Sequence, residues 1–117
     1  MDEDQRLIRI SLEGAVGDAD LINLSRRVRS EPNFAAGWPV LYDCSAATVL
    51  LVTGDLVRSL AQSARRDTIP IAFVAPTAAA FGLARMYQIV SDAADRIHVF
   101  TNAQDALAWI AEVREKK

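Results

Sequence analysis

The fold is decided by residues 39–56, which read PVLYDCSAATVLLVTGDL. The first five, Pro39–Asp43, form a short apolar run. Such a run is typical of a strand covered on both faces, so we predict a central strand there. Residues 44–52 are small or apolar, and we predict that they form a connection. Thr53 can cap a helix with its hydroxyl and Asp55 suits the positive helix end, so we predict a helix from Thr53 to about Thr68.

Upstream of this stretch, residues 7–14 alternate between apolar and polar side chains. The apolar positions are Ile8, Ile10 and Leu12. A period of two with one polar face is typical of a strand at or near a sheet edge. We expect Gly14 and Gly17 to end this strand in a turn.

A helix is predicted next, with Asp18 as its cap. Its apolar positions recur at helical spacing, at Leu21, Leu24 and Val28. Pro32 disfavours helix at the residue before it, so the helix should stop by Ser30. We predict a loop over 33–38, with Phe34 and Trp38 folded back onto the core.

Downstream, residues 69–75 form an apolar run that predicts a third strand, with Pro70 at its start. Pro76-Thr77 should open a third helix that runs to about Ala94. Residues 97–100 predict a fourth strand. Thr101 and Gln104 have the spacing of a capping box, which predicts a last helix with a charged, frayed end.

Strands therefore alternate with helices along the chain, which predicts parallel pairing and an α/β fold. With 117 residues, the chain is long enough for one domain, which we take to span 1–117. We find no linker and no internal repeat.

The composition of the chain argues against several classes of function. The net charge of −2 and the pI of about 5.3 give no basic field for nucleic acid. Cys44 is the sole cysteine, so no intramolecular disulfide can form. The acidic start does not look like a signal peptide, and no apolar run approaches the ~20 residues of a membrane helix. We therefore expect a cytoplasmic protein without a membrane span.

The sequence offers little for catalysis. One histidine and one cysteine make a zinc site very improbable, and phosphate-binding and dinucleotide-binding glycine motifs are absent. We expect His98 to be structural and Cys44 to be a small buried residue without a lowered pKa. Asp43 ends a central strand, and we expect its carboxylate to bond the backbone of the next loop. No cofactor, no metal and no enzymatic activity are predicted.

Two features stand out. Thr53 and Gly54 begin a helix, where a hydroxyl is either a plain cap or a site for phosphate, because helix N-termini favour anions. The chemistry of these residues alone favours the plain cap. The third helix has an apolar face too wide for one core-facing stripe, and an exposed part of it would be a partner or ligand surface. Alternatively, flanking loops with Trp38 and Phe34 cover it.

Residues 7–110 resemble the STAS domain of bacterial anti-sigma factor antagonists, and more closely its SpoIIAA-like branch. The resemblance lies in the strand that leads past Gly14 to Asp18 and Asp20, and in the three stretches VLYDCS (40–45), FGLARMY (81–87) and VFTNAQDALAW (99–109). It implies a sandwich with a four- to five-stranded, mostly parallel mixed sheet and about four helices, largely against one face.

The resemblance also implies a phosphoacceptor. In regulatory members an acidic residue, two hydroxyls and a glycine precede the second helix, and the second hydroxyl is phosphorylated by a partner kinase. Here the matching positions are Leu51, Val52, Thr53 and Gly54. Leu51 and Val52 replace the acidic residue and the first hydroxyl, which argues against phosphorylation and favours an apolar contact.

Two functions are therefore expected. The first is a non-catalytic regulatory or protein-interaction module, as a homodimer or with another protein, using 50–55 and 86–90. The alternative is a binding protein for a small apolar or lipid-like ligand, held in a pocket of Trp38, Phe81, Met86 and Tyr87. The expected interaction or ligand surface comprises Trp38, Leu51, Val52, Phe81, Met86, Tyr87 and Val90.

Overall fold

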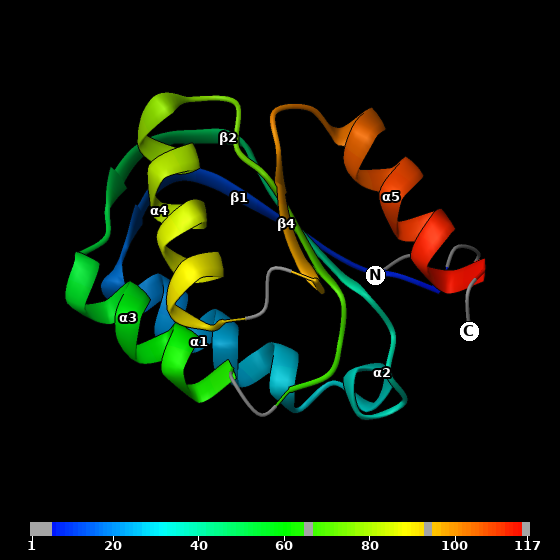
Figure 1. Ribbon diagram of the computed structural model, residues 1–117. Helices are drawn as coiled ribbons and strands as arrows, with labels where there is room; N and C mark the ends of the chain where they lie inside the picture. Colours follow the sequence, from blue (N-terminus) through cyan, green and yellow to red (C-terminus); the bar gives the residue numbers. More distant parts are fainter. Residues whose placement is uncertain (1–5, 65–66, 93–94, 116–117) are drawn as a thin grey trace.

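A computed structural model describes residues 6–64, 67–92 and 95–115 (Figure 1). Strands and helices alternate as predicted, with one short extra helix. In chain order they are β1 (Ile8–Gly17), α1 (Asp18–Arg29), α2 (Pro32–Ala35), β2 (Val40–Leu51), α3 (Gly54–Ser63), β3 (Ile71–Val74), α4 (Ala78–Val90), β4 (Ile97–Phe100) and α5 (Ala103–Glu115).

The described strands form one sheet in the order β1-β2-β3-β4, and every pair is parallel. The parallel pairing predicted from the alternation is confirmed, as are the edge position of β1 and the central position of β2. The mixed sheet implied by the family resemblance is wrong for the described residues. Each connection contains a helix, and a helical crossover returns the chain to the end of the sheet where the previous strand began.

Helices cover the two faces of the sheet unequally. Helices α1, α3 and α4 lie on one face and α5 lies on the other (Figure 1). Because the strands lie in chain order, crossovers of one hand must place all their helices on the same face. Helix α5 follows β4 and is not a crossover, so it can take the opposite face. The expectation that the helices lie largely against one face is confirmed.

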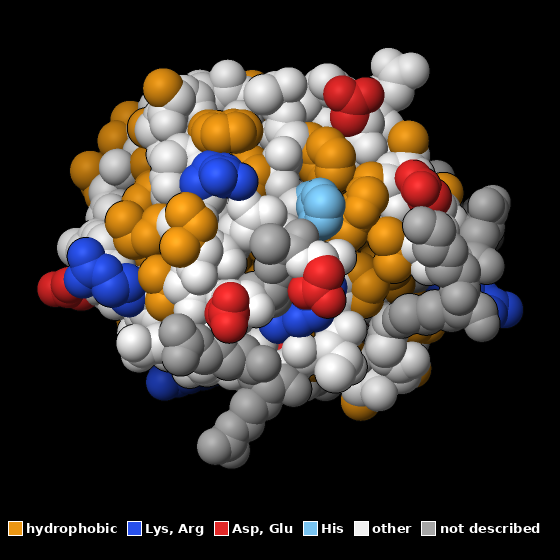
Figure 2. Space-filling model, in the orientation of Figure 1, with side chains coloured by type: hydrophobic (Ala, Val, Ile, Leu, Met, Phe, Trp, Pro, Cys, Tyr) orange, Lys and Arg blue, Asp and Glu red, His pale blue; other side chains and the backbone are white. Residues whose placement is uncertain are grey.

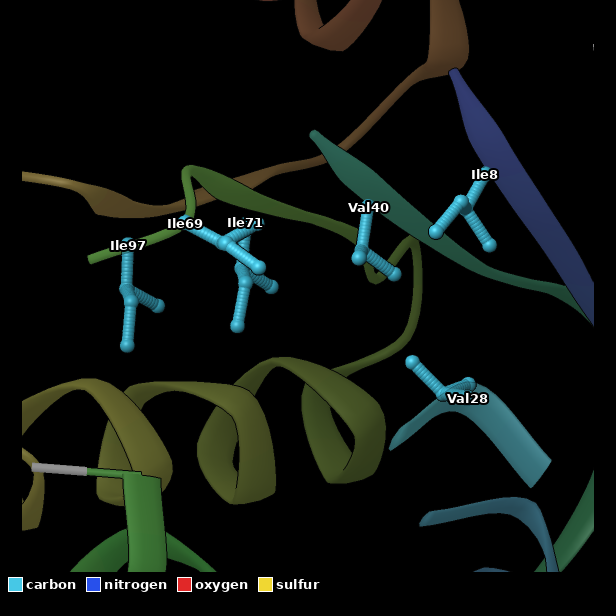
Figure 3. Close-up of a cluster of buried hydrophobic side chains, with 6 residues drawn as sticks. All are labelled: Ile8, Val28, Val40, Ile69, Ile71 and Ile97. Carbon is cyan, nitrogen blue, oxygen red and sulfur yellow. The ribbon is translucent and has the colours of Figure 1, made fainter. Parts of the chain in front are cut away.

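Each face has its own core. On the face of α1, α3 and α4, side chains from all four strands point toward the helices, and Val28 of α1 points back at them (Figure 3). Under α5, a second cluster comprises Leu7, Leu41, Ala72, Val74, Ala106 and Ile110. Neighbours such as Val40 and Leu41 serve opposite cores because successive strand residues point to opposite faces. The predicted apolar run of the central strand is thereby explained.

The predicted connection over 44–52 is wrong, because β2 continues to Leu51. Strand β1 likewise continues past Gly14 to Gly17. The extensions pair with each other from Glu13–Ala46 to Gly17–Leu51, whereas β3 pairs only with Val40–Asp43. One register shift lies just before this stretch and a second lies within it, after Gly14. We call this two-stranded extension, 13–17 with 46–51, the ribbon. Gly14 has a φ of +67°, which glycine adopts without strain, so it forms an irregularity within the strand instead of ending it.

Some of the predicted helix caps are confirmed, and others lie at neighbouring residues. Thr53 and Thr77 cap α3 and α4 with their hydroxyls, as predicted. The predicted cap of α1 by Asp18 is wrong, because Gly17 is the N-cap residue and donates its N–H to Asp20 Oδ2 over 2.8 Å. Part of the predicted loop over 33–38 is the short helix α2.

At α5 the predicted capping box lies one residue too early. Asp105 donates its N–H to Asn102 Oδ1 over 2.8 Å, and Asn102 Nδ2 donates to Asp105 Oδ2 over 3.1 Å. Asn102 is a stronger cap than threonine, which explains the shift. Helices α3 and α4 end at Ser63 and Val90, before their predicted ends. Residues 65–66, 93–94 and 116–117, on which parts of the predicted helix ends fall, lie outside the described residues.

Candidate functional site

A cavity of about 110 Å³ lies between the sheet and helices α1, α3 and α4. Its walls come from strands β1, β2 and β3, from helices α1, α3 and α4, and from Val52 between β2 and α3. The lining residues are Leu12, Leu21, Leu24, Ser25, Arg29, Tyr42, Cys44, Leu50, Val52, Val57, Leu60, Phe73, Ala80, Leu83, Ala84 and Tyr87. Most of these side chains are apolar, so the cavity suits a mostly apolar guest.

Helical spacing explains how one face of α4 forms a wall. Ala80, Leu83, Ala84 and Tyr87 recur at intervals of three and four residues, which places them on one side of the helix. Ala80 and Ala84 are buried, and their small side chains leave the space that larger residues would fill. Leu12 of β1 and Leu50 of β2 pack against the buried cluster that contains these alanines, and both also line the cavity.

Three aromatic rings form one side of the cavity. Tyr42 and Phe73 are paired across β2 and β3, and their rings stack with centroids 5.2 Å apart. Tyr87 of α4 meets Phe73 edge-on at 5.3 Å. These are favourable geometries for aromatic pairs, so the rings hold one another in place.

The polar groups of the cavity include Arg29 and the two phenolic hydroxyls. Arg29 Nη2 lies 2.9 Å from Asp67 Oδ2, and its Nη1 lies 3.4 Å from the other carboxylate oxygen. Burial raises the pKa of Tyr42 well above its usual value, and Tyr87 and Asp67 raise it further while Arg29 opposes them. Burial also raises the pKa of Tyr87, with Asp67 adding to it. Both tyrosines are therefore neutral at physiological pH.

Neither phenolic hydroxyl has a hydrogen-bond partner among the described residues. In the same part of the chain, every fully buried side-chain nitrogen or oxygen has a partner. The hydroxyls of Tyr42 and Tyr87 are therefore not sealed in the protein. Both residues line the cavity.

Cys44 is a small buried residue, as predicted. Asp43 does not end its strand as predicted, because β2 continues to Leu51 and the Asp43 carboxylate bonds the backbone within that strand. Cys44 is buried, and burial together with Asp43 raises the pKa of its thiol to about 11. The thiol is therefore protonated near neutral pH and is a poor nucleophile. Asp43 accepts a hydrogen bond from the Ser45 N–H at 2.9 Å, close to the first register shift of β2.

His98 lies away from the cavity, on the α5 side of the sheet. Its ring centroid is 4.5 Å from that of Trp109 of α5, and it stacks on Phe100 at 6.2 Å. Phe100 and Trp109 pack against the core cluster under α5. The sheet therefore separates the imidazole from any guest in the cavity.

Thr53 is bonded to the protein itself. Its N–H donates to Asp18 Oδ1 over 2.8 Å and its hydroxyl donates to Asp18 Oδ2 over 2.9 Å, while the Leu56 N–H donates to that hydroxyl over 3.2 Å. Asp18 thus occupies the anion position at the start of α3. Gly54 is close to Met86, whose Cε would lie 3.6 Å from an added Cβ. These contacts agree with a plain cap, and phosphorylation stays a prediction.

The other predicted surface residues are dispersed. Of the four side chains expected to form the pocket, only Tyr87 lines the cavity. Val52, which we predicted as part of the wider interaction surface, also lines it. Trp38 packs against the core cluster, as predicted, and borders a separate hollow with Arg6 and Arg114.

The remaining predicted residues lie on α4 and the ribbon. Leu51 is 66% exposed and Phe81 is 36% exposed. Met86 and Val90 are half-buried. Figure 2 shows hydrophobic side chains gathered over α4. Ala47 and Leu50 of the ribbon pack against the cluster that contains Ala80 and Ala84 of this helix. The alternative cover by Trp38 and Phe34 is not seen there, because both pack against the other core cluster on this face.

Sequence reasoning missed most of the cavity, including Leu12, Tyr42, Phe73 and Leu83. One signal was present, because Tyr42 puts a hydroxyl into an otherwise apolar central strand. A buried tyrosine needs a partner for that group, and the sequence around it offers none nearby.

No family model, no curated protein and no solved structure matches this chain. Within 6–64, 67–92 and 95–115, no group of three or more His, Cys, Asp or Glu residues could hold a metal ion. No helix in these ranges is long and apolar enough to cross a membrane.

Proposed function

We propose that this chain is a non-catalytic binding protein whose cavity takes a small, mostly apolar molecule. The observation that carries the proposal is the cavity of about 110 Å³ between the sheet and three helices, lined mainly by leucine, valine, alanine and aromatic side chains. Binding of an apolar guest in such a cavity is favourable, because the guest replaces weakly held water or empty space.

The size of the cavity limits the guest. An engineered apolar cavity of about 150 Å³ binds benzene. The cavity here, at about 110 Å³, suits a single small ring or a short chain, or part of a larger molecule that extends past the ribbon. This supports a small apolar ligand more strongly than a bulky lipid.

The side chains near the guest support binding without catalysis. The Cys44 thiol has a pKa of about 11, and His98 and the Asp43 carboxylate are engaged elsewhere. A nucleophile with an adjacent base, which acyl or group transfer needs, is not assembled among the described lining residues.

Toluene is a suitable first probe, measured by the rise in thermal midpoint and by ligand-observed NMR. Ala84→Leu fills the cavity, whereas Ala79→Leu adds the same side chain at an exposed position of the same helix. We expect toluene to raise the midpoint of the wild type and of Ala79→Leu, and to leave Ala84→Leu unchanged. Equal responses of the two variants would contradict the proposal.

A second proposal keeps the STAS-like assignment: a cytoplasmic regulatory or interaction module that pairs with a second copy. It is favoured by apolar side chains on the surface, with Leu51 and Ile89 each 66% exposed and Val49 48% exposed. Sedimentation velocity tests it. A dimer that dissociates in Leu51→Ser or Ile89→Ser would support it, and a strict monomer at high concentration would count against it.

A further inference from the structure

We propose that the ligand of this cavity is a neutral molecule carrying one hydrogen-bond acceptor, such as a small ketone, held at the hydroxyls of Tyr42 and Tyr87. This inference rests on the proposed binding function and specifies the chemistry of the guest. Its basis is the pair of unpartnered hydroxyls carried by two residues that line the cavity.

The two tyrosines belong to one site, and each interacts electrostatically with the same neighbours. Tyr42 stacks on Phe73 at 5.2 Å and Tyr87 meets the same ring at 5.3 Å, so both tyrosines are fixed around one phenylalanine. Each also experiences the charges of Arg29 and Asp67. One end of the cavity is therefore polar, and the leucines and alanines of the other walls are not.

The hydroxyls favour an acceptor on the guest. Both tyrosines are neutral because burial raises their pKa values, so each can donate a hydrogen bond. A purely apolar guest would displace water from these groups and leave them unpaired, which is costly. A guest with a carbonyl oxygen restores the lost hydrogen bond, and one such oxygen can accept from both donors.

The charges near this end favour a neutral guest. Arg29 is already bonded through two nitrogens to Asp67, so its charge is balanced. A carboxylate guest would approach Asp67 and compete with it for Arg29. An ammonium guest would meet the guanidinium. In both cases the apolar walls would also desolvate the guest's charge.

Three six-membered-ring probes separate these outcomes: cyclohexanone, its isostere methylenecyclohexane, and cyclohexanecarboxylate. Dissociation constants come from ¹H–¹⁵N chemical shift titrations of the full chain. We expect cyclohexanone to bind about tenfold more tightly than methylenecyclohexane, from the cost of one unmade hydrogen bond. We expect cyclohexanecarboxylate to bind most weakly.

Tyr42→Phe and Tyr87→Phe test the residues, and either variant suffices if the other fails to fold. Each should reduce the preference for cyclohexanone over methylenecyclohexane, while methylenecyclohexane binds as well as before or better. Equal binding of the two isosteres to the wild type would overturn the hydrogen-bond inference and leave the proposed function standing. Strongest binding of the carboxylate would overturn the neutral guest. Binding of none of the three probes, together with no response to toluene, would overturn the proposed function itself.

Discussion

The two faces of the sheet are packed to different degrees. Under α5, a single helix meets the strands closely: Leu41 and Ala106 are 0% exposed and Ile110 is 2% exposed. On the opposite face, three helices and the ribbon enclose half-buried aromatic rings and leave a cavity of about 110 Å³. Alternate residues of the same short strands supply both faces. The difference teaches that one sheet can pack closely around α5 on one face and leave space on the other, where we propose that a ligand binds.

The largest expected effect comes from deleting side chains on each face. Leu41→Ala opens a cavity in the packed core under α5 and should cost about 2–5 kcal/mol of unfolding free energy. Leu83→Ala, beside the existing cavity, removes fewer contacts and should cost about half as much or less, since Leu83 is already half-buried. Urea unfolding measures both, and equal losses would break the comparison.

The next largest effect is a pH dependence of the free energy of unfolding, caused by the buried thiol of Cys44 on the cavity face. The folded protein holds the pKa of Cys44 at about 11, above the usual value of 9. The folded state therefore binds this proton more tightly than the unfolded state does. Its contribution to stability is complete below pH 9, declines as pH rises, and is lost above pH 11.

At about 1.4 kcal/mol per pKa unit, the cysteine should account for a loss of roughly 2–3 kcal/mol. Urea unfolding of Cys44→Ala across the same pH range is the control. The variant should retain more of its stability above pH 9 than the wild type retains. Parallel pH profiles of the two proteins would contradict the burial of the thiol.

The smallest effect concerns the contact between two helix starts, where Asp18 at the start of α1 holds Thr53 at the start of α3. Asp18→Ala and Thr53→Val should each cost about 1 kcal/mol, because each removes hydrogen bonds at an exposed helix terminus. A double-mutant cycle should show that the two losses are not additive. Additive losses would mean that the two side chains act independently.

The sequence predicted which strands and helices form better than it predicted where they end. Local patterns were sufficient for the strand over 39–43, the caps at Thr53 and Thr77, and the parallel order. They failed at Gly14, because a glycine that usually ends a strand here permits an irregular one to continue. They failed over 44–52 because small and apolar residues suit a loop and a ribbon equally.

The cavity was the hardest part to predict. It depends on side chains such as Leu12, Tyr42 and Leu83, which are far apart in the sequence and meet only when three helices share one face of the sheet. The pocket predicted from Trp38, Phe81, Met86 and Tyr87 was based mainly on the wide apolar face of one helix. Half-buried side chains such as Met86 satisfy the same pattern without facing the cavity, because helical spacing alone does not locate the sheet.

Chemical shift mapping with toluene tests the central claim most directly, because it reads both faces of the sheet in one titration. We expect saturable shifts in the amides of Tyr42, Ala80 and Ala84 and in their neighbours along β2 and α4, with the amides of Ala106 and Ile110 unmoved. Absence of shifts, or equal shifts on both faces, would contradict the claim that the face of α1, α3 and α4 is the binding face.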